Sequence, residues 1–146
     1  EQGNSEAQYN LGNGYLRGKG VPQDDKEAVR LYRLSAEQGH ASAQYNLGLM
    51  YHQGKGVPQD YKEGVKWHRL SAEQGDADAQ FNLGMKYYEG QGVPQDYVSA
   101  HMWFNLSGSN GHEGGVKSRD IIEKRMSPSQ LEKAQEMARN WKPTKK

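Results

Sequence analysis

The chain has 146 residues, which is enough for one ordinary domain or a short array of small units, and too few for two full enzyme domains. Its 19 basic and 18 acidic side chains leave a formal charge of +1, so a strongly basic nucleic-acid-binding surface is not expected. The absence of cysteine excludes disulfides, thiol nucleophiles and cysteine-ligated metal centres. A mean hydropathy of −1.08, with no long apolar run, argues against a membrane-spanning segment.

A repeat with a period of 36 residues runs through most of the chain. Residues 1–36 match residues 37–72 at 24 of 36 positions without a gap, and residues 37–72 match residues 73–108 at 20 of 36. Such self-similarity is typical of repeat proteins, in which each unit buries its apolar side against its neighbours. The sequence therefore predicts three repeats, at residues 1–36, 37–72 and 73–108.

Each repeat is predicted to begin with a helix. In the first repeat this helix runs from about residue 6 to residue 17, because Ala7, Leu11 and Tyr15 recur at a spacing of four and form an apolar stripe. Gly18 stands where a left-handed residue would end the helix, and Pro22 in the following loop prevents its continuation. The same residues recur one period later, so we expect the same helix in the second and third repeats.

A second helix follows each loop. Asp24 occupies the position of an N-cap, and Glu27 has the spacing of a capping box. The second repeat carries the same pair at Asp60 and Glu63, whereas the third has Ser99 in place of the glutamate. We therefore expect a complete capping box in the first two repeats and not in the third.

A glycine lies inside every first helix, at Gly12, Gly48 and Gly84. Glycine in a helix interior costs about 1 kcal/mol relative to alanine. Because the same unfavourable residue recurs at the same position of each repeat, we expect close helix–helix contact there, where a Cβ would not fit. The alternative is that these glycines only weaken the helix.

The repeat pattern is lost from residue 112 onward. Two further helices are predicted there, at residues 113–125 and 128–141. Ser127 is placed as the N-cap of the last helix, with Pro128 at its first position and Gln130 at its third. We expect residues 109–141 to cap the array with a polar outer face and residues 142–146 to form a short basic tail.

Two motifs resemble the Sel1-like repeat family, which is related to the tetratricopeptide repeats. They are Ala-Gln-Tyr-Asn-Leu-Gly-x-x-Tyr and Gly-x-Gly-Val-Pro-Gln-Asp-Tyr, the latter before a helix that carries Trp. The resemblance covers residues 1–108, and residues 100–141 resemble the closing unit of bacterial members. It implies an all-α fold, a right-handed superhelix or solenoid of three helix-turn-helix repeats with a C-terminal capping helix pair. One solenoid domain over residues 1–146 is expected, as the C-terminal part of a longer chain, because residues 1–3 match the end of a second helix.

The resemblance also implies a function, that of a non-catalytic scaffold or adaptor that binds a protein or peptide on its concave face. In tetratricopeptide-like stacking the first helices line this face. The residues that the resemblance places there are Tyr9, Asn13, Leu16, Arg17, Tyr45, Asn46, Leu49, His52, Gln53, Phe81, Asn82, Met85, Tyr88 and Glu89. The alternative is that the apolar members pack between adjacent first helices. The sequence identifies neither the partner nor the oligomeric state. It does not fix the compartment either, although an extracytoplasmic location is slightly favoured.

An asparagine is identical in all three repeats, at Asn10, Asn46 and Asn82. In tetratricopeptide domains an asparagine at the matching position can bond the backbone or terminal carboxylate of a ligand. A local hydrogen bond between helices explains the repetition equally well, so both interpretations stay open.

Catalytic residues, metal ligands and cofactors are not predicted. His68 stands where the other repeats have an aromatic residue and is expected to be packed, while His40 and His112 lie at helix starts and suit a capping or turn role. No His-x-x-x-His or Ser-x-x-Lys pair occurs, and the recurring aspartates are explained as caps. Two alternatives to the scaffold remain: a cell-envelope, β-lactam or peptidoglycan hydrolase, as suggested for some relatives, and a structural spacer in a larger protein.

Overall fold

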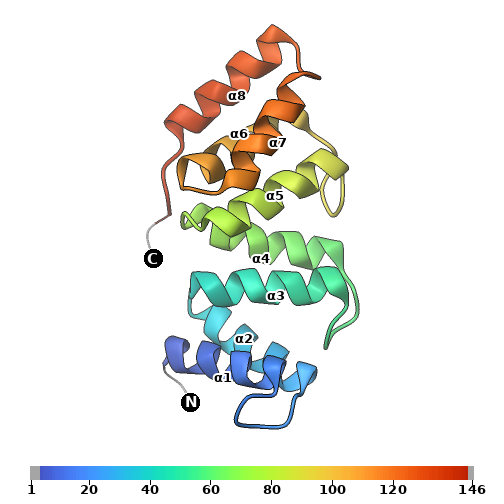
Figure 1. The fold of residues 1–146 in the computed structure, drawn as a ribbon, viewed down its shortest axis with the longest axis vertical. Helices are drawn as coiled ribbons and strands as arrows, with labels where there is room; N and C mark the ends of the chain where they lie inside the picture. The colour runs from blue at the N-terminus through green and yellow to red at the C-terminus, as the bar shows by residue number, and fades with distance from the viewer. Residues whose placement is uncertain (1–3, 145–146) are drawn as a thin grey trace. The chain divides into compact units, whose positions relative to one another are not determined.

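The computed structural model describes residues 4–144, and every regular element within them is an α-helix (Figure 1). The chain divides into two compact units, which we call unit 1 (Glu1–Ser71) and unit 2 (Ala72–Lys146). Unit 1 contains α1 (Ser5–Arg17), α2 (Asp25–Glu37), α3 (Ala41–Gln53) and most of α4 (Tyr61–Glu73). Unit 2 contains α5 (Ala77–Glu89), α6 (Tyr97–Ser109), α7 (Glu113–Glu123) and α8 (Pro128–Asn140).

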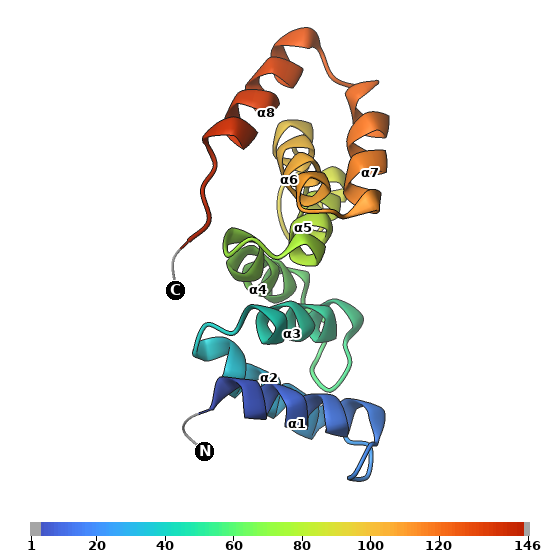
Figure 2. The same ribbon diagram turned by 60° about the vertical axis from the view of Figure 1, so that its left-hand side comes forward.

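Successive helices form hairpins within each unit. In unit 1, α1 packs on α2 and α2 packs on α3, whereas in unit 2 α6 contacts α5, α7 and α8. The turned view in Figure 2 keeps α1 beside α2 and α5 beside α6. The predicted helix pairs are therefore present, and the two helices after the last repeat both pack against α6.

The loop within each repeat is closed by a glycine and by a backbone hydrogen bond. Gly18 ends α1 with a φ of 70°, a left-handed conformation that glycine adopts without strain. After the loop, the N–H of Asp24 donates to the carbonyl of Tyr15 at 2.9 Å, and the N–H of Asp60 donates to Tyr51 at 3.0 Å. The chain thus returns alongside the helix that it has just left.

These backbone bonds explain why the capping boxes predicted at Glu27 and Glu63 are wrong. Asp24 does cap α2, accepting from the N–H of Glu27 at 3.1 Å. However, its own N–H is already used in the loop, and the Glu27 carboxylate pairs with Arg30 at 2.6 Å instead. Glu63 likewise pairs with the lysine one turn later. A complete capping box forms at the start of α8, between Ser127 and Gln130, as predicted.

The close helix contact predicted at the three helical glycines is confirmed. A Cβ on Gly12 would lie 2.9 Å from the Tyr32 ring, and one on Gly84 would lie 2.7 Å from the Phe104 ring. A Cβ on Gly48 would lie 2.6 Å from Nε2 of His68 and 3.0 Å from the carbonyl oxygen of Gly64. Each first helix therefore lies with its backbone against a ring of the second helix.

A buried serine on each second helix also bonds to the first helix of its own repeat. The Oγ atoms of Ser35, Ser71 and Ser107 lie 2.7, 2.9 and 2.8 Å from the carbonyl oxygens of Ser5, Ala41 and Ala77. A buried hydroxyl without a partner costs about 1–3 kcal/mol. These bonds therefore favour one register of the two helices in every repeat.

A buried glutamine connects each later first helix to the second helix before it. Nε2 of Gln44 donates to the carbonyl of Ala36 at 3.1 Å, and Nε2 of Gln80 donates to the carbonyl of Ala72 at the same distance. Both carbonyls lie in the last turn of a helix, where no intrahelical donor is available. Each carbonyl also accepts from the backbone N–H of the glycine after the helix, Gly39 at 2.9 Å or Gly75 at 3.0 Å, so the glutamine adds a second hydrogen bond to it.

A histidine side chain caps the first turn of α3 and of α7. Nδ1 of His40 accepts from Ala43 N at 3.2 Å, and Nδ1 of His112 accepts from Gly115 N at 3.1 Å. The capping role predicted for both histidines is confirmed. Asp76 takes the same position before α5.

The core of each unit contains residues of the second helices together with residues of the helices that pack on them. In unit 1, Val29, Tyr32, Leu47, Met50 and Trp67 are buried in one cluster. In unit 2, the residues of the corresponding cluster are Ala100, Phe104 and Ile122. His68 is fully buried, as predicted for a residue that replaces an aromatic ring.

We expect Gly48→Ala to lower the free energy of unfolding by about 1–2 kcal/mol. Overpacking a helix contact costs roughly 1–3 kcal/mol, which exceeds the gain of about 1 kcal/mol in helix propensity. Urea denaturation followed by circular dichroism measures the change. Gly14→Ala is the matched control, because its Cβ would lie 3.2 Å from the nearest atom, the Lys19 carbonyl oxygen. Equal losses in both variants would contradict the packing explanation.

Asp76 offers a test of the buried cap. Burial raises the pKa of its carboxyl above the ordinary value of 3.8, and the bond from Ala79 N offsets this in part. Because the folded pKa is raised, the associated stability is present at low pH and is lost as the pH rises from about 4. We expect Asp76→Asn, which keeps the cap, to gain stability relative to the original chain between pH 3.5 and pH 7. Thermal melts across this range measure the difference, and a constant difference would refute it.

Candidate partner-binding surfaces

The aromatic residues predicted to face a partner are only half-exposed, because each packs on a ring of the second helix. The ring pairs and their centroid distances are Tyr9–Tyr32 at 6.0 Å, Tyr45–His68 at 5.3 Å and Phe81–Phe104 at 5.8 Å. In addition, Tyr9 stacks on the cap residue His40 at 4.8 Å. These rings therefore stabilise the packing of the helix pairs, and part of each ring stays exposed to a ligand.

Asn13 lies at the centre of a hydrogen-bonded group in unit 1. Its Oδ1 accepts from the hydroxyl of Tyr32 at 2.6 Å and from Nδ2 of Asn46 at 3.5 Å. Burial raises the pKa of the Tyr32 hydroxyl, which keeps it protonated and able to donate. One of the three repeated asparagines therefore bonds locally, between α1 and α3. A second one, Asn82, donates from Nδ2 to the carbonyl of Asp78 within α5 at 3.1 Å.

His52 belongs to the interior of the α3–α4 hairpin more than to its surface. Its ring meets the rings of His68 and Tyr61 edge-on, with centroids 4.9 and 5.7 Å away. A Cβ on Gly64 would lie 2.6 Å from Nδ1 of His52, so the ring fills the space that this glycine leaves. Both ring nitrogens are buried.

The most exposed members of the predicted set stand at the C-terminal ends of the first helices. Arg17, Gln53 and Glu89 occupy the same position in successive repeats, are exposed, and carry positive, neutral and negative side chains. In the preceding position, Leu16 and Tyr88 are half-buried and pack on the cores of units 1 and 2. Leu49 and Met85 are half-buried as well.

Unit 1 has a polar hollow on the surface of α1. It is lined by Asn10, Asn13, Gly14, Arg17 and Lys19, with a volume of about 350 Å³. Two of its five lining residues are basic, and two are amides. This hollow can accept anionic or amide groups of a partner.

Unit 2 has an apolar hollow, which we call the unit 2 pocket. It is lined by Met85, Tyr88, Phe104, Ser118 and Ile121, from α5, α6 and α7, and has a volume of about 220 Å³. Ser118 and Ile121 are not among the residues predicted from the sequence to contact a partner. The available signal was the pair of adjacent isoleucines in a helix, which cannot both face the core: Ile122 is fully buried, whereas Ile121 is 57% exposed.

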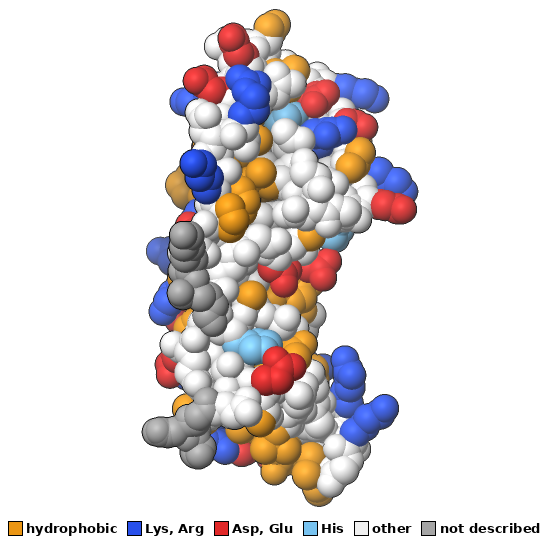
Figure 3. Space-filling model, turned by 90° about the vertical axis from the view of Figure 1, so that its left-hand side faces the viewer, with side chains coloured by type: hydrophobic (Ala, Val, Ile, Leu, Met, Phe, Trp, Pro, Cys, Tyr) orange, Lys and Arg blue, Asp and Glu red, His pale blue; other side chains and the backbone are white. Residues whose placement is uncertain are grey.

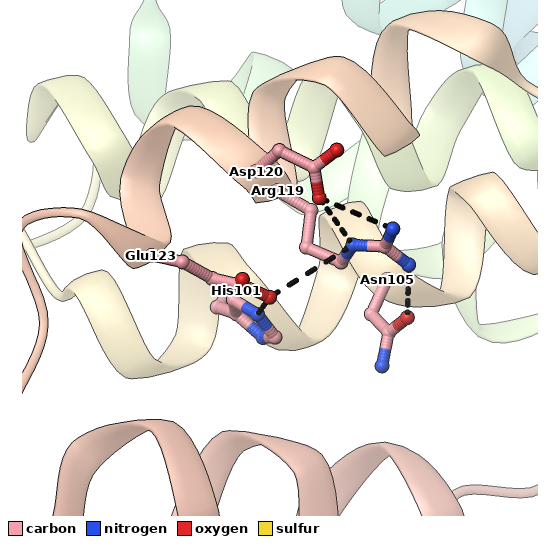
Figure 4. Close-up of polar contacts among 5 residues, drawn as sticks. All are labelled: His101, Asn105, Arg119, Asp120 and Glu123. Atoms are coloured by element: carbon pink, nitrogen blue, oxygen red, sulfur yellow. Dashed lines mark hydrogen bonds and ion pairs between the residues drawn. The ribbon is translucent and has the colours of Figure 1, made fainter. Parts of the chain in front are cut away.

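A cluster of polar side chains joins α6 to α7 (Figure 4). His101 is buried, and its Nε2 lies 2.9 Å from Oε2 of Glu123. Arg119 donates to Oδ1 of Asn105 at 3.2 Å, and its Nε lies 4.0 Å from the same Glu123 oxygen. Asp120 also pairs with Arg119, at 3.2 Å. These contacts hold α7 on the last repeat, and the buried histidine ring is closed to ligands.

Outside these hollows the surface is mixed. Figure 3 shows one face on which charged side chains of both signs surround several separate groups of hydrophobic side chains. Within residues 4–144, no group of three or more His, Cys, Asp or Glu is placed to hold a metal ion. No helix among the same residues is long and apolar enough to span a bilayer.

The Sel1 repeat pattern matches the chain three times, at residues 5–40, 41–76 and 77–112. These repeats have the same 36-residue period as the internal repeat, but each begins four residues later than the repeats that start at residues 1, 37 and 73. Comparison with curated proteins finds no match.

Two crystal structures are similar over most of the chain. One is c5321, a protective antigen of uropathogenic Escherichia coli strains with an SLR fold, which is 40% identical over 96% of this chain, with a TM-score of 0.89. The other is a Sel1 repeat protein from Oxalobacter formigenes, 35% identical over 82% of this chain, with a TM-score of 0.80. The chain spans 30% and 49% of the lengths of these two proteins.

We expect Asn13 to stabilise unit 1 through the Tyr32 hydroxyl. Asn13→Ala removes the acceptor of a buried donor and should lower the free energy of unfolding by about 1–2 kcal/mol. In a Tyr32→Phe background the same change should cost less than half as much, because no donor is left unpaired. Urea denaturation of the four proteins in this cycle measures the coupling. Equal costs in the two backgrounds would show that Asn13 acts in another way.

Proposed function

Because the chain belongs to the Sel1 repeat family, whose repeats typically mediate protein interactions, we propose that it is a scaffold that binds a protein or peptide segment on its first helices. Each unit offers its own surface: the exposed faces of α1 and α3 in unit 1, and those of α5 and α7 in unit 2. The relatives described above are considerably longer proteins. The proposal therefore concerns the binding capacity of these residues.

The observation that carries this proposal is the contrast between packed and exposed positions in the repeats. The glycine that contacts the ring and the serine that bonds to the first helix are identical in all three repeats. By contrast, the exposed position at the helix end changes from Arg17 to Gln53 to Glu89. A constant frame with a different exposed surface in each repeat suits the recognition of partner segments of different chemistry.

The two hollows support the same interpretation. The polar hollow of unit 1 offers Arg17 and Lys19, whereas the unit 2 pocket offers carbon surface from Met85 and Tyr88. Interfaces combine such apolar anchor sites with a polar rim. Each unit thus carries one part of what a peptide-binding surface requires.

A non-catalytic role agrees with how the titratable side chains are used. His40 and His112 cap helices, His68 is buried in packing, and the buried His101 is held by a hydrogen bond with Glu123. The recurring Asp24 and its equivalents begin the second helices. The Sel1 repeat family is generally a non-catalytic repeat scaffold, and no observation favours the hydrolase alternative.

The test is a random dodecapeptide library displayed on phage and selected on the purified chain. Enriched peptides are synthesised and titrated into isotope-labelled protein, and we expect amide shift changes on α1, α3, α5 and α7. Arg17→Glu or Glu89→Lys should change the affinity of a peptide bound to the same unit by roughly two- to fivefold, as expected for one exposed charge. Lys26→Glu on α2 and Glu132→Lys on α8 are the matched controls, because these residues are exposed away from the first helices.

Two results would contradict the proposal. If the shift changes map to the exposed faces of α2, α4 and α6, the binding surface is misassigned. If no peptide is enriched above the level seen with an unrelated helical protein, the structural-spacer alternative gains support. Turnover of a β-lactam or a peptidoglycan fragment, lost on neutralising one carboxylate, would favour the hydrolase.

A further inference from the structure

We propose that the unit 2 pocket binds one large apolar side chain of a partner peptide that carries an acidic residue beside it. This inference rests on the proposed function, because it assigns a ligand to one part of the first-helix surface. Phe104 is 1% exposed and forms the deep part of the pocket, whereas Ile121 is 57% exposed at its edge. The residues between them are half-buried Met85 and Tyr88.

The size of the pocket favours a side chain over a cofactor. Its volume of about 220 Å³ is below the roughly 300–1,000 Å³ typical of sites for drug-sized ligands and cofactors. Interface anchors are single aromatic or large aliphatic side chains that fill a small apolar pocket. A phenylalanine, leucine or methionine side chain therefore suits this pocket.

The corresponding place in unit 1 is filled, which shows how the pocket arises. Two periods (72 residues) earlier, Asn13 corresponds to Met85, Tyr32 to Phe104 and Asn46 to Ser118. In unit 1 these three side chains bond to one another through the Tyr32 hydroxyl and the Asn13 oxygen. In unit 2 the hydroxyl is missing and the long amide is replaced by a short serine. The hydrogen-bonded side chains of unit 1 thus have no counterpart in unit 2, where an apolar hollow lies instead.

The charges beside the pocket favour an acidic neighbour in the ligand. Arg125 follows α7, and its guanidinium lies 3.5 Å from the hydroxyl of Tyr97, whose ring stacks on that of Tyr88 at 5.6 Å. Lys117 lies one helical turn before Ile121 on the same face of α7. Both cations are exposed, and among the described residues neither has a carboxylate at ion-pair distance.

Two of the three acidic groups of α7 do not neutralise this edge, because they are used elsewhere. Glu123 pairs with His101, and Asp120 pairs with Arg119 (Figure 4). Glu89, which lies one turn after Met85 on α5, is the acidic residue on the opposite wall. Glu113, the third acidic group of α7, lies two turns before Ile121 and so farther along the helix than Lys117. The nearer cations, Lys117 and Arg125, favour a peptide with acidic flanks, and Glu89 supplies a control of opposite sign.

The probe is a fluorescein-labelled nonapeptide with a central Phe between Asp and Glu residues, measured by fluorescence anisotropy at low salt. Replacing its Phe by Ala should weaken binding roughly tenfold or more, because an apolar pocket is left unfilled. Replacing its acidic residues by Asn and Gln should weaken binding by about two- to fivefold, and added salt should reduce this difference.

Variants of the chain locate the binding. Ser118→Leu, which fills the pocket, should weaken binding roughly tenfold. Arg125→Gln should weaken binding by about two- to fivefold, Glu89→Gln should strengthen it by a similar factor, and the control Lys133→Gln on α8 should change it little. Arg125 and Glu89 are exposed, so their variants report on binding even if Ser118→Leu does not fold.

Three results would overturn the inference. They are a peptide with Lys and Arg flanks that binds more tightly, an affinity unchanged by replacing the Phe, or an affinity that neither Ser118→Leu nor Arg125→Gln changes. In the last case, a peptide that still shifts the amides of α1 and α3 would leave the proposed function intact. Failure of every peptide in the library selection would remove both.

Discussion

A glycine in the first helix of each of the three repeats lets the helix backbone lie directly against a ring of the second helix, and the helix pair of the repeat closes on this contact. The rings are Tyr32, His68 and Phe104, and in each case an added Cβ would collide with the ring. Glycine in a helix interior weakens the helix by about 1 kcal/mol, so the contact must return more than that in packing. Other features of the repeat follow from this approach, because the buried serine can reach a carbonyl of the first helix when the two helices are close.

The buried polar residues make the packing specific. An apolar contact tolerates small shifts along a helix, whereas a hydroxyl such as that of Ser35 needs an acceptor at one position. Gln44 and Gln80 likewise need an acceptor at one position, since each adds a second hydrogen bond to a carbonyl in the last turn of the preceding helix. Hydrophobic burial thus drives the helices together, and these hydrogen bonds determine which arrangement is kept.

The repeat, the helix ends and the glycine contacts could be predicted from the sequence because they depend on local pattern and on strict recurrence. Sequence reasoning failed where a side chain had a choice of partners. Glu27 has the spacing of a capping box, yet its carboxylate binds Arg30, because the N–H that it would accept from already donates to Tyr15. Nothing in the spacing reveals that competition, since the competing carbonyl is brought close by the fold.

The unit 2 pocket could not be predicted from the sequence for a different reason. The residue pattern of the repeats is lost from residue 112, but α7 begins at Glu113, two periods (72 residues) after the start of α3 at Ala41. Helical positions therefore continue in register although the residue types change. Ser118 corresponds to Asn46 in this register, and Ile121 corresponds to Leu49. The correspondence becomes visible once the helix starts are known.

The ring position connects the frame to the surface. Tyrosine, histidine and phenylalanine all fill the space beside the glycine, but they differ in their polar atoms: the Tyr32 hydroxyl bonds to Asn13, Nε2 of His68 lies 3.2 Å from the Tyr45 carbonyl oxygen, and the Phe104 ring has no polar atom. A tyrosine there requires an acceptor, and Asn13 supplies it in unit 1. With Phe104 in its place, an asparagine at position 85 would have no hydroxyl to accept from, so an apolar Met85 fits better. The short Ser118 completes the same exchange. The surface of a unit can therefore change from polar to apolar through a few coupled positions, while the glycine, the serine and the helix ends that define the fold stay the same.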